Sequence, residues 1–508
     1  MHVFQGKNSE SLKAGLVLAA LTLVTRVWIF GNPVIGIDEQ FYLLAGERML
    51  HGALPYVDIW DRKPIGLFLI YALANRSFAD PVIGYQLLSA VSVALTSWFL
   101  FAIARRFAGY AASLAAAAAY PAWLLVFAGV GGQSPTYYNL PMIAGAALLL
   151  TIMARQDDRR LTTTGCGIMV LCGIALQIKY SAVFDGIFFG LTLLWAGWRR
   201  GWPLARLAAT GLVWIACALA PTLAAWAAYL AMGHGDAFIQ ANFRSIFGDV
   251  NSLGLSLLRL FGLNVGLSPF WICAWLAWRR RERGNAAMAW LFAWSAASFA
   301  GFLVFGVYYD HYVLPLLLPL CLVAALAFDR IAAQRLAMTL IIGLGLAGGF
   351  GRAIIDRHTY GNKQEATQLA AAIRPLLGNG CLYVNEELPI LYWLTHSCLP
   401  TRFAFPEHLV LYRYENALGV NQLGELRRIL AQRPAVVVKS TAPDDDTRPA
   451  SRALLEAELA RNYSAVCQAS VGVTRFEIYV PHSGAPLAAL SSAPGASGAP
   501  SPGLRSCR

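Results

Sequence analysis

Long apolar runs separated by short polar connections make up most of the chain up to about residue 350. A membrane-spanning helix needs about 20 mostly apolar residues. Runs of roughly this kind cover residues 14–31, 82–104, 108–128, 138–154, 162–178, 183–198, 207–231, 260–278, 286–306, 312–328 and 336–352. The pattern therefore predicts an all-α polytopic membrane domain of about eleven spans over residues 1–352.

Two segments decide the count of spans. Residues 107–154 contain no charged side chain before Arg155 and are long enough for two spans, with the break at residues 131–136, where Gly and Pro favour a turn. The segment from Pro64 to Asn75 is apolar but has only 12 residues. That length favours an interfacial or re-entrant helix against the outer surface.

The orientation follows from the positions of Lys and Arg in the short loops. If the N-terminus is cytoplasmic, the cations at 105–106, 155–160, 199–206, 279–283 and 330–335 all fall on that side. Much of the net charge of +12 is therefore an orientation signal, and we expect no nucleic acid as partner. Only 13% of the residues are charged. We expect a multi-pass protein of a bacterial inner membrane, without a cleavable signal peptide.

An odd number of spans places the region after residue 352 outside, in the periplasm. Residues 353–480 predict a small α/β domain, because helix-like and β-rich stretches alternate there. Expected helices cover 363–377, 386–395, 421–432 and 447–461, and expected strands cover 380–384, 435–440, 463–470 and 473–480. Residues 481–508 are rich in Pro, Gly, Ser and Ala and predict a disordered tail.

Eight of the nine cysteines fall into two groups. Cys381, Cys398 and Cys467 lie in the domain that is expected outside, where oxidation is permitted. One pair of them could bond, but the spacing does not select which. Five others lie within the spans and are expected to be small core residues: Cys166, Cys172, Cys217, Cys273 and Cys321.

The first outer loop is the densest group of ionisable side chains. Asp38 and Glu39 follow the first span, and Tyr42 lies one helical turn beyond Asp38, so that both can share a face. The loop ends in Asp61-Arg62-Lys63-Pro64. A solvated loop with salt bridges is the plain interpretation, and in it Asp38 would pair with Arg26.

The pattern of this loop resembles that of the GT-C superfamily of integral-membrane glycosyltransferases. The matching motifs are D-E-x-x-Y at 38–42 and G-x-x-x-Y-x-D-x-W-D-x-K-P at 52–64. The most similar branch is that of the bacterial dolichyl-phosphate-mannose-protein mannosyltransferase-like proteins, with the aminoarabinose transferases and Rgt-type transferases. The resemblance implies that Asp38 is the catalytic acid, that Glu39 and Tyr42 are its neighbours, and that Lys63 contacts the donor phosphate.

Two later segments extend the resemblance. Residues 173–179 match a G-x-A-x-x-x-K pattern that ends in Lys179, and His311-Tyr312 opens an H-Y segment before the tenth span. One departure concerns residues 137–139, which read Tyr-Tyr-Asn where many relatives carry a second acid. Its absence puts a two-acid or metal-bridged mechanism in doubt, although a divalent cation on Asp38 or Glu39 stays an alternative. No His or Cys spacing indicates zinc.

The chemistry that the resemblance implies suits these side chains. A sugar on a polyprenyl phosphate leaves a phosphate anion behind, which needs cations, here Lys63, Arg62 and Lys179. The acceptor needs a base, for which Asp38 is the best candidate, and a single displacement predicts inversion. Aromatic residues that could stack on a sugar, and other candidates for sugar or acceptor, are Tyr42, Tyr56, Trp60, Glu39, His311 and Tyr312. Arg244 and Arg259 are further candidates for the phosphate, and Asp185 is expected to be a helix-end residue.

We therefore expect a membrane glycosyltransferase that moves a sugar from a polyprenyl-phosphate donor to a glycan, lipid or protein. The alternative is a transporter or flippase of a lipid-linked sugar. A transporter should carry ionisable residues near mid-bilayer, whereas those of this chain gather at one face. A third interpretation, an O-antigen polymerase or ligase, would place its large outer loop between late spans.

Overall fold

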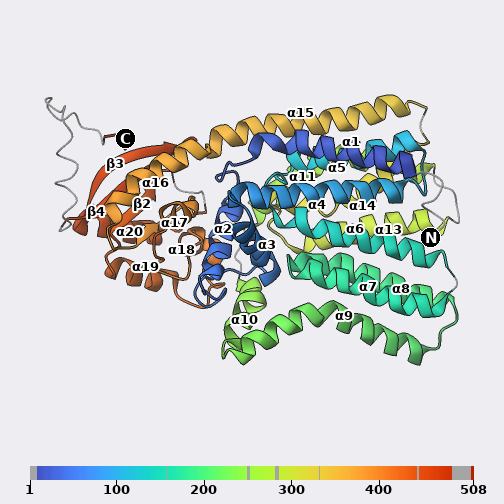
Figure 1. Ribbon diagram of the computed structural model, residues 1–508, viewed down its shortest axis with the longest axis horizontal. Coiled ribbons are helices and arrows are strands. Elements are labelled where there is room, and N and C mark those ends of the chain that lie inside the picture. Colours follow the sequence, from blue (N-terminus) through green and yellow to red (C-terminus); the bar gives the residue numbers. More distant parts are fainter. Residues whose placement is uncertain are drawn as a thin grey trace.

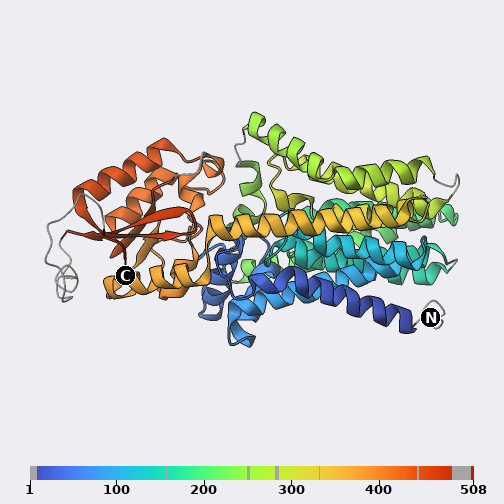
Figure 2. The ribbon, with the colours of Figure 1, turned by 90° about the horizontal axis from the view of Figure 1, so that it is seen from above.

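The computed structural model describes residues 8–155, 157–248, 252–280, 285–330, 332–442, 446–482 and 505–507. A helical bundle and a small α/β domain lie end to end along the long axis, and the N-terminus lies at the end of the bundle farthest from the α/β domain (Figure 1). A view turned by 90° shows the same separation (Figure 2). The predicted fold class is confirmed.

Each apolar run contains at least one helix of the bundle. These helices are α1 (Asn8–Arg26, continued by η1, Val27–Ile29), α4 (Pro81–Ala104), α5 (Tyr110–Val126), α6 (Ser134–Met153), α7 (Asp158–Leu176), α8 (Val183–Arg199, preceded by η2, Tyr180–Ala182), α9 (Leu204–Ala231), α11 (Leu253–Gly266) with α12 (Ser268–Arg279), α13 (Ala286–Val304), α14 (Leu317–Phe328) and α15 (Gln334–Tyr360). The last predicted span thus continues as a helix beyond residue 352.

Not all of these helices meet a strict length and hydropathy test for a span. Seven described helices do, and an eighth span results if α11 and α12, which meet at a bend of 60°, are one broken span. The shorter α5 and α14 have 17 and 12 residues. Every residue of α14 is buried, so this helix faces protein along its length. The helix α7 begins with the polar segment 158–164, which lowers its hydropathy.

Short helices cap the bundle at the end that faces the α/β domain. The segment predicted to be interfacial forms α3 (Ile65–Ser77), which packs against α2 (Ile37–Leu50). Both lie between the bundle and the α/β domain (Figure 1). The other short elements of the membrane domain are α10 (Gly235–Asn242), η3 (Arg244–Gly248) and η4 (Asp310–Val313). The break predicted at 131–136 lies where α6 begins, at Ser134.

The α/β domain follows α15 through Gly361, whose positive φ of 85° lets the chain turn into α16. Its four strands are ordered β1-β2-β4-β3, with β1 parallel to β2 and the other pairs antiparallel. The elements are α16 (Lys363–Leu377), β1 (Leu382–Val384), α17 (Ile390–Thr395), α18 (Glu407–Val410), η5 (Tyr412–Tyr414), α19 (Gln422–Ala431), β2 (Val436–Ser440), α20 (Pro449–Asn462), β3 (Tyr463–Val471) and β4 (Thr474–Pro481). The four strands and the helices α16, α17, α19 and α20 lie in the predicted stretches, whereas α18 and η5 lie in a segment for which no element is predicted.

Two disulfides brace the α/β domain. Cys381 bonds Cys398, and Cys467 on β3 bonds Cys507. The second bond ties the end of the predicted tail to the sheet; most of that tail lies outside the described residues. The five cysteines in the spans are free.

Two hydrogen bonds donated by main-chain amides fasten the α/β domain to the first outer loop and α2. The amide of Ile390 donates to Gln40 Oε1 on α2 over 3.3 Å, and the amide of Trp60 donates to the Arg402 carbonyl over 2.8 Å. Because these bonds join segments more than 300 residues apart, the domain is seated on the loop that carries the candidate chemistry.

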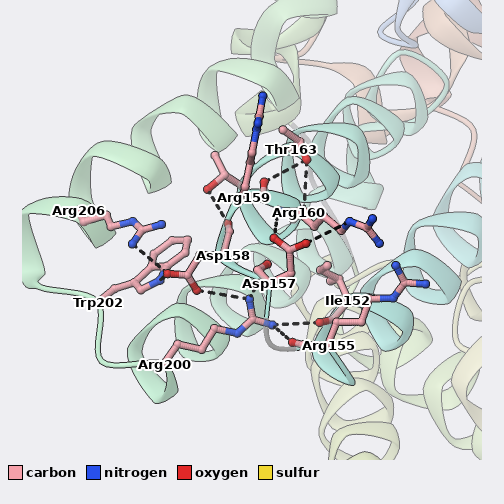
Figure 3. Close-up of polar contacts among 11 residues, drawn as sticks. Ile152, Arg155, Asp157, Asp158, Arg159, Arg160, Thr163, Arg200, Trp202 and Arg206 are labelled. Carbon is pink, nitrogen blue, oxygen red and sulfur yellow. Dashed lines mark hydrogen bonds and ion pairs between the residues drawn. The ribbon is translucent and has the colours of Figure 1, made fainter.

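The opposite end of the bundle holds a polar cluster at the α6–α7 and α8–α9 turns (Figure 3). Arg200 donates to the carbonyl of Ile152, in the last turn of α6, over 3.0 Å, and to that of Arg155, which follows the helix. Asp158 accepts from Trp202 over 2.8 Å and from Arg206 over 3.0 Å. These arginines, which serve as an orientation signal in the sequence, therefore also close the turns at this end of the bundle.

The arrangement predicts that the two ends of the molecule lie on opposite sides of the membrane. An epitope inserted after Gly201, in the exposed α8–α9 turn, should be reached by antibody only after the cells are permeabilised. An epitope inserted after Asn379, in the exposed turn before β1, should be reached in spheroplasts without permeabilisation. Labelling of both insertions, or of neither, in sealed spheroplasts would contradict the topology.

Candidate active site

Two acids begin α2 at the end of the bundle that faces the α/β domain. The Asp38 side chain is 19% exposed, whereas Glu39 is buried, with 2% exposed. A Cβ atom at Gly36 would lie 2.2 Å from Glu39 Oε2, and one at Gly131 would lie 2.7 Å from Oε1. These two glycines make the space into which the Glu39 carboxyl group fits. Both acids also lie in the first turn of a helix, where negative charge is stabilised.

Gln133 joins the two acids. Its Nε2 lies 3.3 Å from Asp38 Oδ2 and 3.1 Å from Glu39 Oε2, so the amide donates toward both carboxyl groups. Gln133 precedes α6, in the loop that the sequence predicts only as a turn. Gln133 is not among the site residues that the sequence predicts, and its place after two glycines at a span junction is the available signal.

Arg26 holds the loop that carries Gln133. Its guanidinium donates to the carbonyls of Gly129 and Val130 over 2.5 Å each, and to Ser89 Oγ over 3.1 Å. Arg26 is buried, with 2% exposed. The alternative in which Arg26 pairs with Asp38 is wrong, because the guanidinium of Arg26 donates to this loop.

Lys63 lies opposite Asp38, with its Nζ 3.9 Å from Asp38 Oδ1. The loop around it is tightly held. The Lys63 amide donates to Asp61 Oδ1 over 2.8 Å, and the Tyr56 hydroxyl donates to the Lys63 carbonyl over 2.9 Å. Pro64 is the N-cap of α3, so the K-P motif places Lys63 directly before that helix.

Lys179 approaches the same place from the end of α7. Gly66 on α3 allows this approach, since a Cβ there would lie 2.6 Å from the Gln177 carbonyl. That carbonyl accepts from the Leu67 amide over 3.1 Å. The Lys179 Nζ lies 4.3 Å from the ring centre of Tyr312 on η4. The start of α3 and the end of α7 therefore bring both lysines to one site.

The segment η4 completes the wall of the site. The His311 ring centre lies 4.8 Å from that of Tyr312. Asp310 forms a 2.7 Å ion pair with Arg352 on α15, which anchors η4 to the bundle. Both predicted residues of the H-Y segment are thus placed beside Lys179.

The charge states follow from these surroundings. Burial alone would raise the pKa of Asp38, but attraction to Lys63 and Lys179 and the Gln133 hydrogen bond lower that pKa to about 2. Burial and the neighbouring charge of Asp38 raise the pKa of Glu39 to about 8. Asp38 is therefore ionised and Glu39 protonated at neutral pH.

Burial also shifts the pKa values of the basic side chains in the site. It lowers the pKa of Lys179 to about 8, helped by the repulsion from Lys63. It lowers the pKa of His311 well below the usual value, so this imidazole is neutral. The pKa of Lys63 is raised, since attraction to Asp38 and Asp61 outweighs burial. Lys63 is the permanent cation of the pair, and Lys179 titrates.

The three aromatic candidates of the first loop are all buried. Tyr56 packs against Tyr229, with ring centres 5.3 Å apart, and Trp60 packs between Phe403 and His408 at 5.5 and 4.8 Å. With 1–2% exposed, neither Tyr56 nor Trp60 offers a free ring face to a sugar; both hold the loop. Tyr42 is equally buried, but its hydroxyl has no hydrogen-bond partner among the described residues.

The remaining candidates lie around this core. Arg62 lies with its guanidinium carbon 5.1 Å from the ring centre of Tyr414, at the contact with the α/β domain. Arg259 lies 4.8 Å from the ring centre of Tyr309, next to η4, whereas Arg244 is on η3. Asp185 is buried between α8 and α13 and accepts from Trp294 over 2.7 Å. It serves as a link between helices.

The residues present are a poor fit for a divalent cation. Such an ion needs several oxygen ligands, and the described residues contain no group of three or more His, Cys, Asp and Glu that could hold a metal. Asp38 and Glu39 are adjacent, but the Lys63 ammonium lies where a cation would approach Asp38. The charge of Asp38 is balanced by lysines instead.

Part of the chain matches a known protein family. Residues 62–226 match the family model described as dolichyl-phosphate-mannose-protein mannosyltransferase. The match includes Lys63 and Lys179 and begins after Asp38. Among curated protein sequences, none matches this chain significantly.

Solved structures show the fold. ArnT from Cupriavidus metallidurans in the apo state is similar with a TM-score of 0.62 at 16% identity, over 91% of this chain and 97% of that chain. The same protein bound to undecaprenyl phosphate has a TM-score of 0.58 at 16% identity, over 92% and 97%. The oligosaccharyltransferase of Archaeoglobus fulgidus in the apo form has a TM-score of 0.50 at 11% identity, over 86% and 70%. The predicted resemblance to GT-C glycosyltransferases is confirmed as a likeness of fold.

The hydrogen bonds of Arg26 lead to a prediction about stability. Arg26→Met should lower the free energy of unfolding by about 3 kcal/mol or more, because several buried carbonyls lose their donor. The midpoint of thermal unfolding in detergent measures the effect. Ser89→Ala, which removes only one of the partners, is the control and should cost about 1 kcal/mol. An Arg26→Met protein as stable as the wild type would contradict the role of Arg26 in holding the loop.

Proposed function

We propose that the protein is a glycosyltransferase that moves a sugar from a polyprenyl-phosphate donor to an acceptor at the outer face of a bacterial inner membrane. One observation carries the proposal. An ionised carboxylate, Asp38, lies 3.9 Å from Lys63 and in the same cluster as Lys179, at the end of the bundle covered by the α/β domain. The N-terminus is then cytoplasmic and the α/β domain periplasmic.

The reaction is a single displacement. Asp38 accepts the proton of the acceptor hydroxyl or amine as its oxygen or nitrogen bonds to the anomeric carbon. The bond from that carbon to the phosphate oxygen breaks, and its electron pair stays on the phosphate. Lys63, Lys179 and Arg62 stabilise the charge that develops there. Because attack and departure occur on opposite faces of the sugar, the configuration inverts.

Glu39 acts as a neutral partner of Asp38. Protonated and hydrogen-bonded to Gln133, it leaves Asp38 as the charged member of the acidic pair. Its proton, the Tyr42 hydroxyl, and the side chains of His311 and Tyr312 are the groups we assign to the sugar and the acceptor. The buried rings of Tyr56 and Trp60 support the loop instead.

The donor lipid is supported by the comparisons and by the surface near Lys179. The matched family is described by a lipid-phosphate sugar, and one similar structure is bound to undecaprenyl phosphate. A cavity of about 60 Å³ beside Lys179 and Tyr312 is lined by α8 and α13, with the rings of Phe184 and Phe302 next to the polar Asp185 and Ser298. We place the first part of the lipid tail there.

A flippase of a lipid-linked sugar is the second candidate. It would move the sugar lipid across the bilayer without breaking the bond to phosphate. The buried ionisable residues Arg26 and Asp185 lie in the last turn of α1 and the first turn of α8, both toward the site. This distribution favours chemistry at one face of the membrane over a path through it.

Replacing the base tests the proposal. Asp38→Asn should lower the rate of transfer from radiolabelled undecaprenyl-phosphate sugars by about 10²- to 10⁴-fold, because the carboxylate that accepts the proton is gone. Asp58→Asn is the control, since Asp58 is an exposed acid of the same loop. Full transfer by a folded Asp38→Asn protein would rule out Asp38 as the base, and sugar-lipid translocation without transfer by the wild type would favour a flippase.

The pH dependence should follow Lys179. As the pH rises through about 8, Lys179 loses its proton and the donor phosphate loses a cation, so kcat/KM for the donor should fall. No acid limb from Asp38 is expected near neutral pH, because its pKa is about 2. Lys179→Arg keeps its charge and should move the alkaline limb to higher pH. A limb that stays at about pH 8 in this variant would assign it to Glu39 instead.

A further inference from the structure

The segment of the α/β domain that faces the site contains a buried arginine. Arg413 lies on η5 and is 6% exposed, and its neighbour Tyr414 is 7% exposed. A buried cation is costly unless its surroundings compensate for the lost water. Arg413 belongs to a domain that lies outside the bundle, yet its side chain is directed toward the membrane domain.

Aromatic rings connect Arg413 to the cations of the site. Its guanidinium carbon lies 5.1 Å from the ring centre of Tyr309 and 5.5 Å from that of Tyr414. Arg62 lies over the same Tyr414 ring, at 5.1 Å. The Tyr309 ring is 5.7 Å from that of Tyr312, over which Lys179 lies. Cations from three parts of the chain therefore surround one group of tyrosines.

Charge around this group is mainly positive. Lys63, Arg62, Lys179, Arg259 and Arg413 are the cations, and Asp38, Asp61 and Glu407 are acids near them. Asp310 on η4 is a fourth acid, and its charge is paired with Arg352. The Tyr312 hydroxyl responds to the cations: burial would raise its pKa, but Arg413, Lys179 and Arg62 together lower it. An anion placed beside Tyr312 would be attracted by all three.

We propose that Arg413 is a phosphate-binding residue of the donor site, so that the α/β domain supplies part of the site itself. The inference rests on the proposed function, since the phosphate is that of the polyprenyl carrier. A guanidinium suits this role because it can donate two parallel hydrogen bonds to phosphate oxygens.

The charge change during the reaction indicates where Arg413 acts. The donor is a phosphodiester with one negative charge, whereas the released polyprenyl phosphate is a monoester with up to two. The Arg413 cation therefore stabilises the leaving group more than the donor. Such an interaction raises kcat with little change in the KM for the donor.

Binding of undecaprenyl phosphate to the full-length protein in nanodiscs tests the inference, with native mass spectrometry or a fluorescence titration as readout. Arg413→Gln should weaken binding of this lipid by about tenfold to a hundredfold, as for loss of a hydrogen bond between charged groups. Arg413→Lys keeps the charge but cannot donate two parallel hydrogen bonds, so its affinity for the lipid should be intermediate. In transfer assays Arg413→Gln should lower kcat and leave the donor KM within about twofold.

Arg402→Ala is the matched control. Arg402 belongs to the same domain and lies over an aromatic ring, that of Phe403, at 4.9 Å, but lines a different cavity beside Asp58. Arg402→Ala should leave lipid binding unchanged.

Undiminished binding by a folded Arg413→Gln protein, while the wild type binds, would overturn this inference alone. Absence of binding by the wild type would overturn it together with the proposed function. If Arg413→Gln does not fold, the same comparison is made with Arg413→Lys. An Arg413→Lys protein that binds the lipid as tightly as the wild type, and has the same kcat, would overturn the inference.

Discussion

A charged carboxylate that has little contact with water is the constraint on which the rest of the site depends. Asp38 can stay ionised there only because two lysines and an amide donor surround it. Each of these partners comes from a different helix end, so the starts of α3 and α6 and the end of α7 must all meet the start of α2. The bundle positions charges, and the charges in turn explain the close packing at Gly66 and Gly131.

Support for this arrangement comes from both sides of the membrane edge. Within the bundle, Arg26 donates hydrogen bonds to the loop before α6 and not to Asp38. These bonds hold Gln133 against both carboxyl groups. From outside, the α/β domain is hydrogen-bonded to the first loop and brings Arg413 to the tyrosines of η4. The domain is therefore part of the electrostatic environment of the site.

Local patterns predicted most of this architecture and the polar residues that follow a helix end. Asp38, Glu39, Lys63, Lys179 and His311 come together because each lies at a junction that hydropathy can locate. The burial of Tyr56 and Trp60 was not predictable, since it depends on partners such as Tyr229 and Phe403 that lie more than 150 residues away. Gln133, Arg413 and the Cys467–Cys507 disulfide were missed for the same reason. The roles of Arg413 and of this disulfide arise from tertiary contacts that carry no local signal, whereas Gln133 at least follows two glycines at a span junction.

The central claim is that the cations opposite Asp38 hold a lipid phosphate. An experimental structure with undecaprenyl phosphate bound tests it most directly. The account predicts the phosphate within hydrogen-bond distance of Lys63 and Lys179, with space for a sugar between it and the Asp38 carboxylate. A phosphate bound elsewhere, for example at the arginine cluster of the opposite end, with Lys63 and Lys179 unchanged, would contradict the account.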